Sequence, residues 1–209
     1  QLYRQKEEEK KIFEEKIKEI DEKIKTLKAT EQEAFIKLLK AEGKELKSAA
    51  INAFKYLGWT KAVDVDEYWK NVIRDKEEDI WLIEDSDQPI EVSLRKGFLI
   101  LVVVRSSKNW AADDDCIRLQ RFKGRRMQEF DNTRMKGLLL GNYFNQQEAR
   151  LRNNPFSQFQ IEEAEKDGNA LLTTYELFKA IKAEKEGLIT KEEIRRQLKE
   201  RSGLIQFNL

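Results

Sequence analysis

A short stretch of the sequence concentrates positive charge in a pattern that suits phosphate binding. The segment RLQRFKGRR contains Arg118, Arg121, Lys123, Arg125 and Arg126. In a helix, Arg118, Arg121 and Arg125 share one face, because residues three and four apart are neighbours on a helix surface. Such a stripe can follow a nucleic-acid backbone through salt-dependent phosphate contacts. The alternative is a solvated face that pairs with the acidic run 113–115 or with acids elsewhere in the chain.

Residues near this basic cluster extend the same two interpretations. Arg134 and Lys136 continue the basic region toward the next predicted strand. Trp110 and Phe122 have the side-chain type that stacks on bases in single-strand binding sites. For Phe122, packing in the core is the stronger expectation. The cluster therefore predicts either a local nucleic-acid surface or a charged face exposed to water.

The composition limits the chemistry available to the chain. Its 209 residues include 40 Lys and Arg against 39 Asp and Glu, a net charge of +1, so any nucleic-acid site must be a local patch. The absence of histidine excludes His-based triads, His-ligated zinc and His general bases. The single Cys116 excludes an internal disulfide and fits a reducing cytoplasm. No apolar run reaches the roughly 18 residues of a membrane span, so we expect a cytoplasmic protein without a membrane partner.

The first part of the chain, residues 1–40, has the heptad pattern of a coiled coil. Its seam positions are Phe13, Ile17, Ile20, Ile24 and Leu27, with Ala34 and Leu38 resuming the register. Lys and Glu fill nearly all positions between them, as flanks of such a seam do. We expect this helix to join copies of the chain into a homo-oligomer; the alternative is a solvated helix that docks on the domain. The chain begins at Gln1 without Met, so we also expect a fragment of a longer protein.

The second part, residues 41–209, alternates predicted strands and helices. We expect a helix over 43–57, strands within 60–69, 79–85 and 89–105, a helix over 116–130, a strand over 137–144, a helix over 157–168, a strand over 169–174 and two further helices. The segment 89–105 also allows a hairpin that turns at Lys96–Gly97. Thr173 with Glu176 and Thr190 with Glu193 have the capping-box spacing that begins a helix. Because the later strands alternate with helices, part of the sheet should be parallel, with helices on its faces.

This order of elements resembles the PD-(D/E)xK restriction-endonuclease-like superfamily, and within it Mrr-like bacterial nuclease domains. The resemblance covers about residues 39–183. It rests on GKELKSAAINAFKYLGW, EEDIWLIED and KGLLLGNYF followed by NALLTTYELFKAI. It implies an α/β fold with a mixed sheet flanked by helices and the apolar strand 98–105 at its centre. In active members, an Asp on the second strand and a Glu on the third hold a divalent metal, and a Lys two residues past the Glu orients the attacking water.

The residues at these motif positions depart from the active pattern. Asp79 matches the first acid, whereas in FLILVVVRSS Val103 stands at the Glu position and Arg105 at the Lys position. Valine cannot bind a metal, and arginine keeps the charge but cannot act as a base. Beside Arg105, Asp79 should stay ionised yet be a poor metal ligand. The resemblance therefore implies a degenerate site with no metal and no cofactor.

Other residues offer alternative roles in the same site. Glu91, followed by Val92 and Ser93, is an alternative second acid, which with Asp79 would hold Mg²⁺ or Mn²⁺ in an active nuclease. Glu45 lies where relatives often carry an acid on the first helix, and Gln120 where some relatives carry a glutamine near the site. For Asp79 the plain alternative is an acid at a strand end. For Glu45 it is an exposed helix acid.

These observations favour a catalytically inactive nuclease-like domain on a coiled-coil stalk. It would bind nucleic acid, with DNA as the expected partner, or serve assembly inside a larger bacterial protein; family analogy adds a role in defence. One alternative is an active divalent-metal-dependent DNA nuclease that uses Asp79 and Glu91. Another is an oligomerisation or partner-binding module without affinity for nucleic acid. Metal-dependent cleavage and salt-dependent DNA binding separate the three.

Overall fold

The computed structural model describes residues 13, 16–22, 33–72, 78–84 and 87–207. The chain divides into two compact units, Gln1–Ile36 and Lys37–Leu209. In the first unit, residues 16–22 are helical, and Phe13, Ile17 and Ile20 of the predicted seam are 68%, 55% and 54% exposed. The other central seam positions, Ile24 and Leu27, lie outside the described residues. Association through this seam therefore stays a prediction.

The second unit is built around a six-stranded mixed sheet, with the strands in the order β1-β2-β3-β4-β5-β6. They are β1 (Lys61–Asp64), β2 (Ile80–Ile83), β3 (Leu99–Ser106), β4 (Met135–Asn142), β5 (Ala170–Thr173) and β6 (Gly203–Leu204). Strands β1 to β3 pair antiparallel, and β3 to β6 pair parallel. The predicted central position of strand 98–105 is confirmed. Its first six residues are buried, which is why this strand is the most apolar in the chain.

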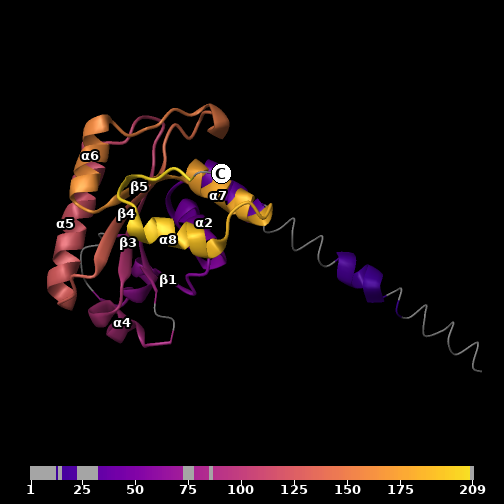
Figure 1. The fold of residues 1–209 in the computed structure, drawn as a ribbon, viewed down its shortest axis with the longest axis horizontal. Coiled ribbons are helices and arrows are strands. Elements are labelled where there is room, and N and C mark those ends of the chain that lie inside the picture. Colours follow the sequence, from indigo (N-terminus) through magenta and orange to yellow (C-terminus); the bar gives the residue numbers. More distant parts are fainter. Residues whose placement is uncertain (1–12, 14–15, 23–32, 73–77, 85–86, 208–209) are drawn as a thin grey trace, which may run out of the picture. The chain divides into compact units, whose positions relative to one another are not determined.

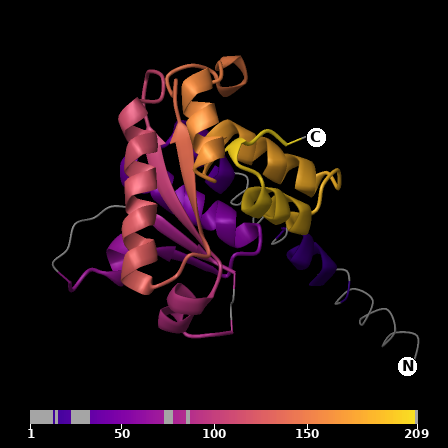
Figure 2. The ribbon, with the colours of Figure 1, turned by 60° about the vertical axis from the view of Figure 1, so that its left-hand side comes forward.

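Helices cover both faces of the sheet. They are α2 (Gly43–Tyr56), α3 (Val65–Tyr68), α4 (Ile90–Lys96), α5 (Asp113–Phe130), α6 (Gln158–Lys166), α7 (Thr174–Lys185) and α8 (Lys191–Glu200), with a 3-10 turn at Ala149–Leu151. Figure 1 shows α5 and α6 on one side of the sheet and α2, α7 and α8 on the other, and Figure 2 shows the same layers from another direction. Among the described residues, no helix is both long and apolar enough to cross a membrane.

Helix starts follow the predicted capping residues. The Thr173 Oγ1 accepts a hydrogen bond from the Glu176 amide at 3.1 Å, and the Thr190 Oγ1 accepts one from the Glu193 amide at 3.2 Å. Each bond satisfies one of the amides that a first helical turn leaves without a partner. The beginnings of α7 and α8 are therefore set by local sequence, as predicted.

The expected strand or hairpin before Gly97 was wrong, because residues 90–96 form the helix α4. Ile90 and Leu94 are one helical turn apart, and both pack against the cluster that contains Trp81. Pro89 stands at the helix start, where a missing amide proton costs no hydrogen bond. A spacing of four in a short segment was thus mistaken for strand alternation.

The expected strand over 60–69 is shorter than predicted. It ends at Asp64, whose Oδ1 accepts the amides of Asp66 and Glu67 at 3.0 and 3.4 Å and so begins α3. The two-residue strand β6 was not predicted either. Gly203 there has a φ of +72°, a conformation that glycine adopts without strain.

A buried ion pair fastens α5 to the residues before β2. Arg126 Nε donates to Glu78 Oε1 at 2.6 Å, and Arg126 Nη2 donates to Glu78 Oε2 at 3.1 Å. Each residue is 2% exposed. Trp81 Nε1 donates to the same Oε1 at 2.7 Å, and Arg126 also pairs with Glu129. Both oxygens of a buried carboxylate are thus satisfied, as burial of charge requires.

Replacing Glu78 with alanine should strongly destabilise the domain. The change would leave the buried Arg126 without the carboxylate that binds two of its nitrogens, and breaking a buried pair from one side costs about 3 kcal/mol. Urea unfolding of both proteins measures the difference. Asp114→Ala is the matched control, because it removes an exposed 2.6 Å pair with Arg118 on the same helix and should cost under about 1 kcal/mol. Equal losses in the two variants would contradict the importance of the buried pair.

Candidate functional site

The predicted motif positions meet at the edge of the sheet that is formed by strand ends, where β2 begins and β3 ends. Ile80 is the register partner of Val102 in this antiparallel pair, so Asp79 comes opposite Val103. The Val104 amide donates to Asp79 Oδ2 at 2.7 Å, which holds the carboxylate against β3. The structure therefore brings together the first acid and the two positions on the third strand.

Arg105 joins two carboxylates at this edge. Its Nε donates to Asp115 Oδ1 at 3.2 Å, and its Nη1 lies 3.5 Å from Asp79 Oδ2 while also donating to the Val104 carbonyl at 2.9 Å. The three side chains of Arg105, Asp79 and Asp115 are 28%, 25% and 16% exposed. Within the described part of the chain, the remaining nitrogen, Nη2, has no hydrogen-bond partner. One guanidinium thus links β2, β3 and the first turn of α5.

Tyr143, which the sequence did not single out, completes this arrangement. Its hydroxyl donates to Asp115 Oδ2 at 3.1 Å. Its ring lies over Gly141, the register partner of Arg105, and a Cβ at Gly141 would come within 2.0 Å of a ring carbon. Burial, and then the charge of Asp115, raises the pKa of Tyr143 above its ordinary range, so the hydroxyl stays a neutral donor. The glycine is needed for the tyrosine to reach its partner.

The pKa of Asp79 shifts in the direction opposite to the one expected from Arg105 alone. Burial raises the pKa of Asp79 above its ordinary value, although the Val104 amide, Arg105 and Lys47 all act to lower it. The nearby Asp66 adds to the rise. Desolvation therefore outweighs the single neighbouring guanidinium that was expected to fix the ionised form.

A second charged group lies beside Asp79 and comes from α2. Lys47 is 8% exposed, and its Nζ lies 2.7 Å from Asp64 Oδ1 and 2.8 Å from Asp66 Oδ2. The residue that α2 contributes near the site is thus a lysine. Glu45, the predicted acid on this helix, is exposed, and no ion pair of Glu45 is found among the described residues.

The residues present do not fit a divalent cation. Val103 is fully buried and packs against Leu119 and Leu139, so the second ligand position is part of the core. Asp79 and Asp115 already accept hydrogen bonds from Val104, Arg105 and Tyr143. No group of three or more acids or cysteines with metal-binding geometry occurs in the described part of the chain. A hard cation needs several free oxygen ligands, and here a guanidinium occupies the space between the carboxylates.

Two other predicted site residues lie elsewhere. Glu91 is on α4, which connects the end of β2 to the start of β3, and so lies at the opposite end of both strands from Asp79. It accepts a hydrogen bond from the Tyr68 hydroxyl at 2.9 Å. Gln120 faces the space between α5 and α6, where its Oε1 accepts from Asn169 Nδ2 at 3.0 Å. The structure does not bring either of them to Asp79.

The basic stripe on α5 is only partly a surface feature. Arg118, Arg121 and Arg125 are exposed, and Arg118 pairs with Asp114, one of the upstream acids. Lys123 and Arg126 are buried instead, together with Leu119 and Phe130, because α5 lies along the sheet and these positions face inward. Lys123 donates to the Asp167 carbonyl at 2.6 Å and to Asn169 Oδ1 at 2.8 Å. Three of the five predicted residues therefore have exposed side chains.

Of the two residues that extend the basic stripe toward β4, one is buried and the other is exposed. Lys136 is 4% exposed and donates to the carbonyls of Lys199 and Arg201 at the end of α8; burial lowers its pKa to about 8. Arg134 is exposed and donates to the Lys96 carbonyl at 3.2 Å.

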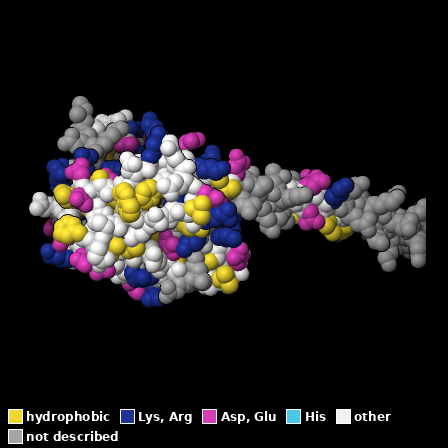
Figure 3. All heavy atoms as spheres, turned by 90° about the horizontal axis from the view of Figure 1, so that it is seen from above, with side chains coloured by type: hydrophobic (Ala, Val, Ile, Leu, Met, Phe, Trp, Pro, Cys, Tyr) yellow, Lys and Arg dark blue, Asp and Glu magenta, His cyan; other side chains and the backbone are white. Residues whose placement is uncertain are grey.

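The two aromatic residues near the stripe also differ in exposure. Trp110 is 59% exposed and contacts Phe144 edge to face, with ring centroids 5.1 Å apart, whereas Phe122 packs against the core, as expected. On the face shown in Figure 3, basic and acidic side chains are interspersed.

The mixed sheet, its strand order and its helical layers define a restriction-endonuclease-like fold. This fold is that of the restriction endonuclease FokI, to which the chain is similar with a TM-score of 0.51 and 17% sequence identity over 82% of this chain and 30% of the other. A second FokI structure, described as bound to DNA, matches with a TM-score of 0.40 and 17% identity over 85% of this chain and 34% of that one. The chain thus spans about a third of the FokI chains. No protein-family model and no curated protein matches the sequence.

Replacing Arg105 with methionine should destabilise the domain in a pH-dependent way. An unfolded chain releases the Asp79 proton near the ordinary pKa of 3.8, whereas burial makes the folded chain hold it to higher pH. The free energy of unfolding therefore falls as pH rises above that value, and it should fall further without Arg105. We expect Arg105→Met to lose about 1–2 kcal/mol at neutral pH and less near pH 4.

Urea unfolding across this pH range measures the effect. Arg121→Met is the matched control, since Arg121 is an exposed residue of α5 and its loss should change stability little at any pH. A loss for Arg105→Met that is the same near pH 4 and at neutral pH would show that Arg105 does not stabilise ionised Asp79.

Proposed function

We propose that residues 37–209 form a nuclease-fold domain that lacks metal-dependent cleavage and acts in nucleic-acid binding or in the assembly of a larger protein. The observation that carries this proposal is Arg105, which lies between Asp79 and Asp115 where the fold's active members place a metal and a lysine. An arginine does not lose its proton near neutral pH, so it cannot serve as a base, and its charge opposes a cation. Val103 supplies no ligand, because its side chain has no donor atom, and it is buried in the core.

Nucleic-acid binding is supported by two groups of residues. Arg105 Nη2 has no partner among the described residues and stands at the edge where the fold's active members bind a substrate phosphate. On α5, Arg121 and Arg125 are exposed one helical turn apart, a spacing that allows contacts to a phosphate backbone. Trp110 offers an exposed ring for stacking on a base. We propose DNA as the ligand because of the likeness in fold, which is analogy.

Assembly is supported by the first forty residues. Phe13, Ile17 and Ile20 expose apolar side chains at heptad spacing on described helical positions, and a seam of this kind is stable when a second helix covers it. We propose that this stalk pairs two copies of the chain. The setting that we propose is a larger bacterial protein of the cytoplasm that acts in defence against foreign DNA.

The active-nuclease alternative would need Glu91 as the second metal ligand. That residue lies on α4, at the far end of β2 and β3 from Asp79, so no observation favours the alternative. A pure assembly module without affinity for nucleic acid remains the competing function, and the DNA-binding experiment separates it from the proposal.

The unmodified chain should bind duplex DNA without cutting it. We expect no cleavage of plasmid or single-stranded DNA with Mg²⁺ or Mn²⁺, and binding that weakens as salt rises, because phosphate contacts release counterions. Arg121→Glu should weaken binding about fivefold at low salt. Lys182→Glu is the matched control, since Lys182 is an exposed residue of α7, on the other face of the sheet.

Three outcomes would contradict parts of this account. Metal-dependent cleavage that is lost in Asp79→Ala would show an active nuclease. Equal weakening by Arg121→Glu and Lys182→Glu would show that α5 is not the binding surface. Absence of DNA binding at low salt would leave assembly as the function of the domain.

The chain should also self-associate through its first unit. We expect sedimentation of the full chain to show a dimer or larger species, and the double variant Ile17→Glu with Ile20→Glu to shift it to monomer, because charges in an apolar seam oppose pairing. Lys18→Glu changes an exposed residue of the same helix outside the seam and should leave association intact. A monomeric parent at high concentration would exclude the coiled-coil pairing.

A further inference from the structure

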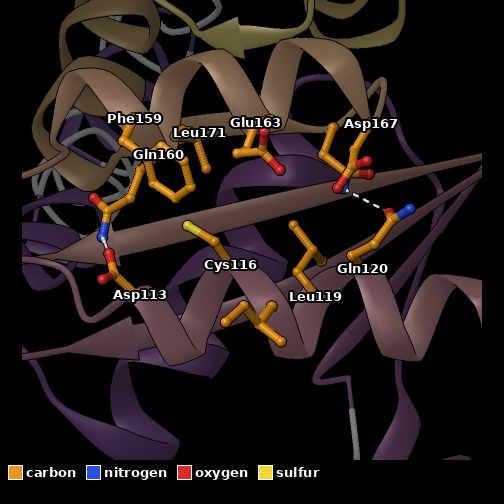
Figure 4. A pocket seen from close by; sticks show the side chains of 12 residues that line it. Asp113, Cys116, Leu119, Gln120, Phe159, Gln160, Glu163, Asp167 and Leu171 are labelled. Carbon is orange, nitrogen blue, oxygen red and sulfur yellow. Dashed lines mark hydrogen bonds between the residues drawn. The ribbon is translucent and has the colours of Figure 1, made fainter.

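A cavity of about 310 Å³ lies between α5 and α6, on the face of the sheet that these helices cover. Its floor is apolar and includes Leu119, Ala164 and Leu171, which are buried. Figure 4 shows the Cys116 sulfur directed into it from α5. Burial raises the pKa of the Cys116 thiol to about 11, with help from Asp115 and Asp113, so the sulfur is neutral and adds to the apolar floor.

Two hydrogen bonds connect residues that line this cavity. At one end Gln160 Nε2 donates to Asp113 Oδ1 at 2.8 Å, and at the other Asn169 Nδ2 donates to Gln120 Oε1 at 3.0 Å. Both bonds are drawn in Figure 4. The volume of the cavity is at the lower end of the range of about 300–1,000 Å³ that small-molecule sites occupy.

The charged residues that line the cavity are all acidic. Asp113, Glu163 and Asp167 line it, and no lysine or arginine is among the twelve lining residues of the described chain. Figure 4 shows Glu163 directed into the space from α6. Its neighbour Lys166 lies 3.5 Å from Glu163 Oε1 but is 74% exposed. In a chain with nearly equal numbers of acids and bases, this local excess of carboxylates favours a cationic ligand.

Two large apolar side chains stand at the cavity wall. Ile117 of α5 and Phe159 of α6 line it, yet they are 60% and 65% exposed. A ligand that covers exposed apolar side chains beside a concave apolar surface removes apolar area from water, and this contributes favourably to its binding free energy. The ligand should therefore have an apolar body that reaches both residues.

We propose that this cavity binds a small ammonium compound with an aromatic or alkyl body. The body lies on the floor between Ile117 and Phe159, and the ammonium group pairs with Glu163. This site is separate from the edge that carries Arg105, so the inference does not rest on the proposed function.

Calorimetric titration with naphthylethylamine and with its anionic counterpart naphthylacetate tests the proposal. The unmodified chain should bind the amine up to about fivefold more tightly than the acetate, the upper end of what a half-exposed ion pair provides. Glu163→Gln should remove this preference. Glu162→Gln is the matched control, because Glu162 is an exposed neighbour on α6 that does not line the cavity; it should keep the preference.

A second variant tests the location independently of charge. Cys116→Met extends the side chain into the cavity and should weaken binding of the amine at least about fivefold by filling the space. Equal affinity for amine and acetate, absence of amine binding at millimolar concentration, or identical effects of Glu162→Gln and Glu163→Gln would each overturn the proposal.

Discussion

The contact on which the candidate site depends is the bridge from Arg105 to Asp79 and Asp115. It connects the start of β2, the end of β3 and the first turn of α5 through one side chain. Asp79 and Asp115 both contact this one guanidinium, and two ionised carboxylates gathered there need a positive charge close to both of them. A metal ion or a guanidinium can meet this requirement, but both cannot occupy the same place. In this structure the guanidinium of Arg105 supplies the positive charge.

Buried basic side chains bind oxygen atoms elsewhere in the domain as well. Lys47 lies between Asp64 and Asp66, Arg126 is bound by Glu78, and Lys123 and Lys136 donate to carbonyls at the ends of α6 and α8. These charges act inside the fold, since each of the four residues is under 9% exposed. A chain in which charged residues make up 38% of the sequence therefore has a smaller free basic surface than its composition suggests.

Much of the fold could be predicted, because its signals are local. The apolar run of β3 marks an interior strand, and Thr173 and Thr190 mark helix starts through their own hydroxyl groups. The region of α4 was misjudged, since Ile90 and Leu94 fit both a strand and a short helix until the packing of Trp81 decides between them. Short segments of this kind depend on tertiary contacts that the sequence does not display.

That Asp79, Val103 and Arg105 lie together at the ends of two neighbouring strands was predictable from the resemblance in sequence, and the register of β2 with β3 brings them together. Tyr143 and Asp115 were missed as partners of Arg105. The acidic run 113–115 predicted pairing with the arginines of α5, and Asp114 does pair with Arg118. Asp115 faces the sheet instead, a difference of one helical position that depends on how α5 lies on the strands.

Binding of Mn²⁺ by the unmodified chain, followed by electron paramagnetic resonance, tests most directly whether Arg105 has replaced the metal. The account predicts no stoichiometric site, only the weak binding of exposed carboxylates. The double variant Val103→Glu with Arg105→Lys serves as the comparison with the ligands of the active pattern restored. One tightly bound Mn²⁺ per unmodified chain, lost in Asp79→Asn, would contradict the account.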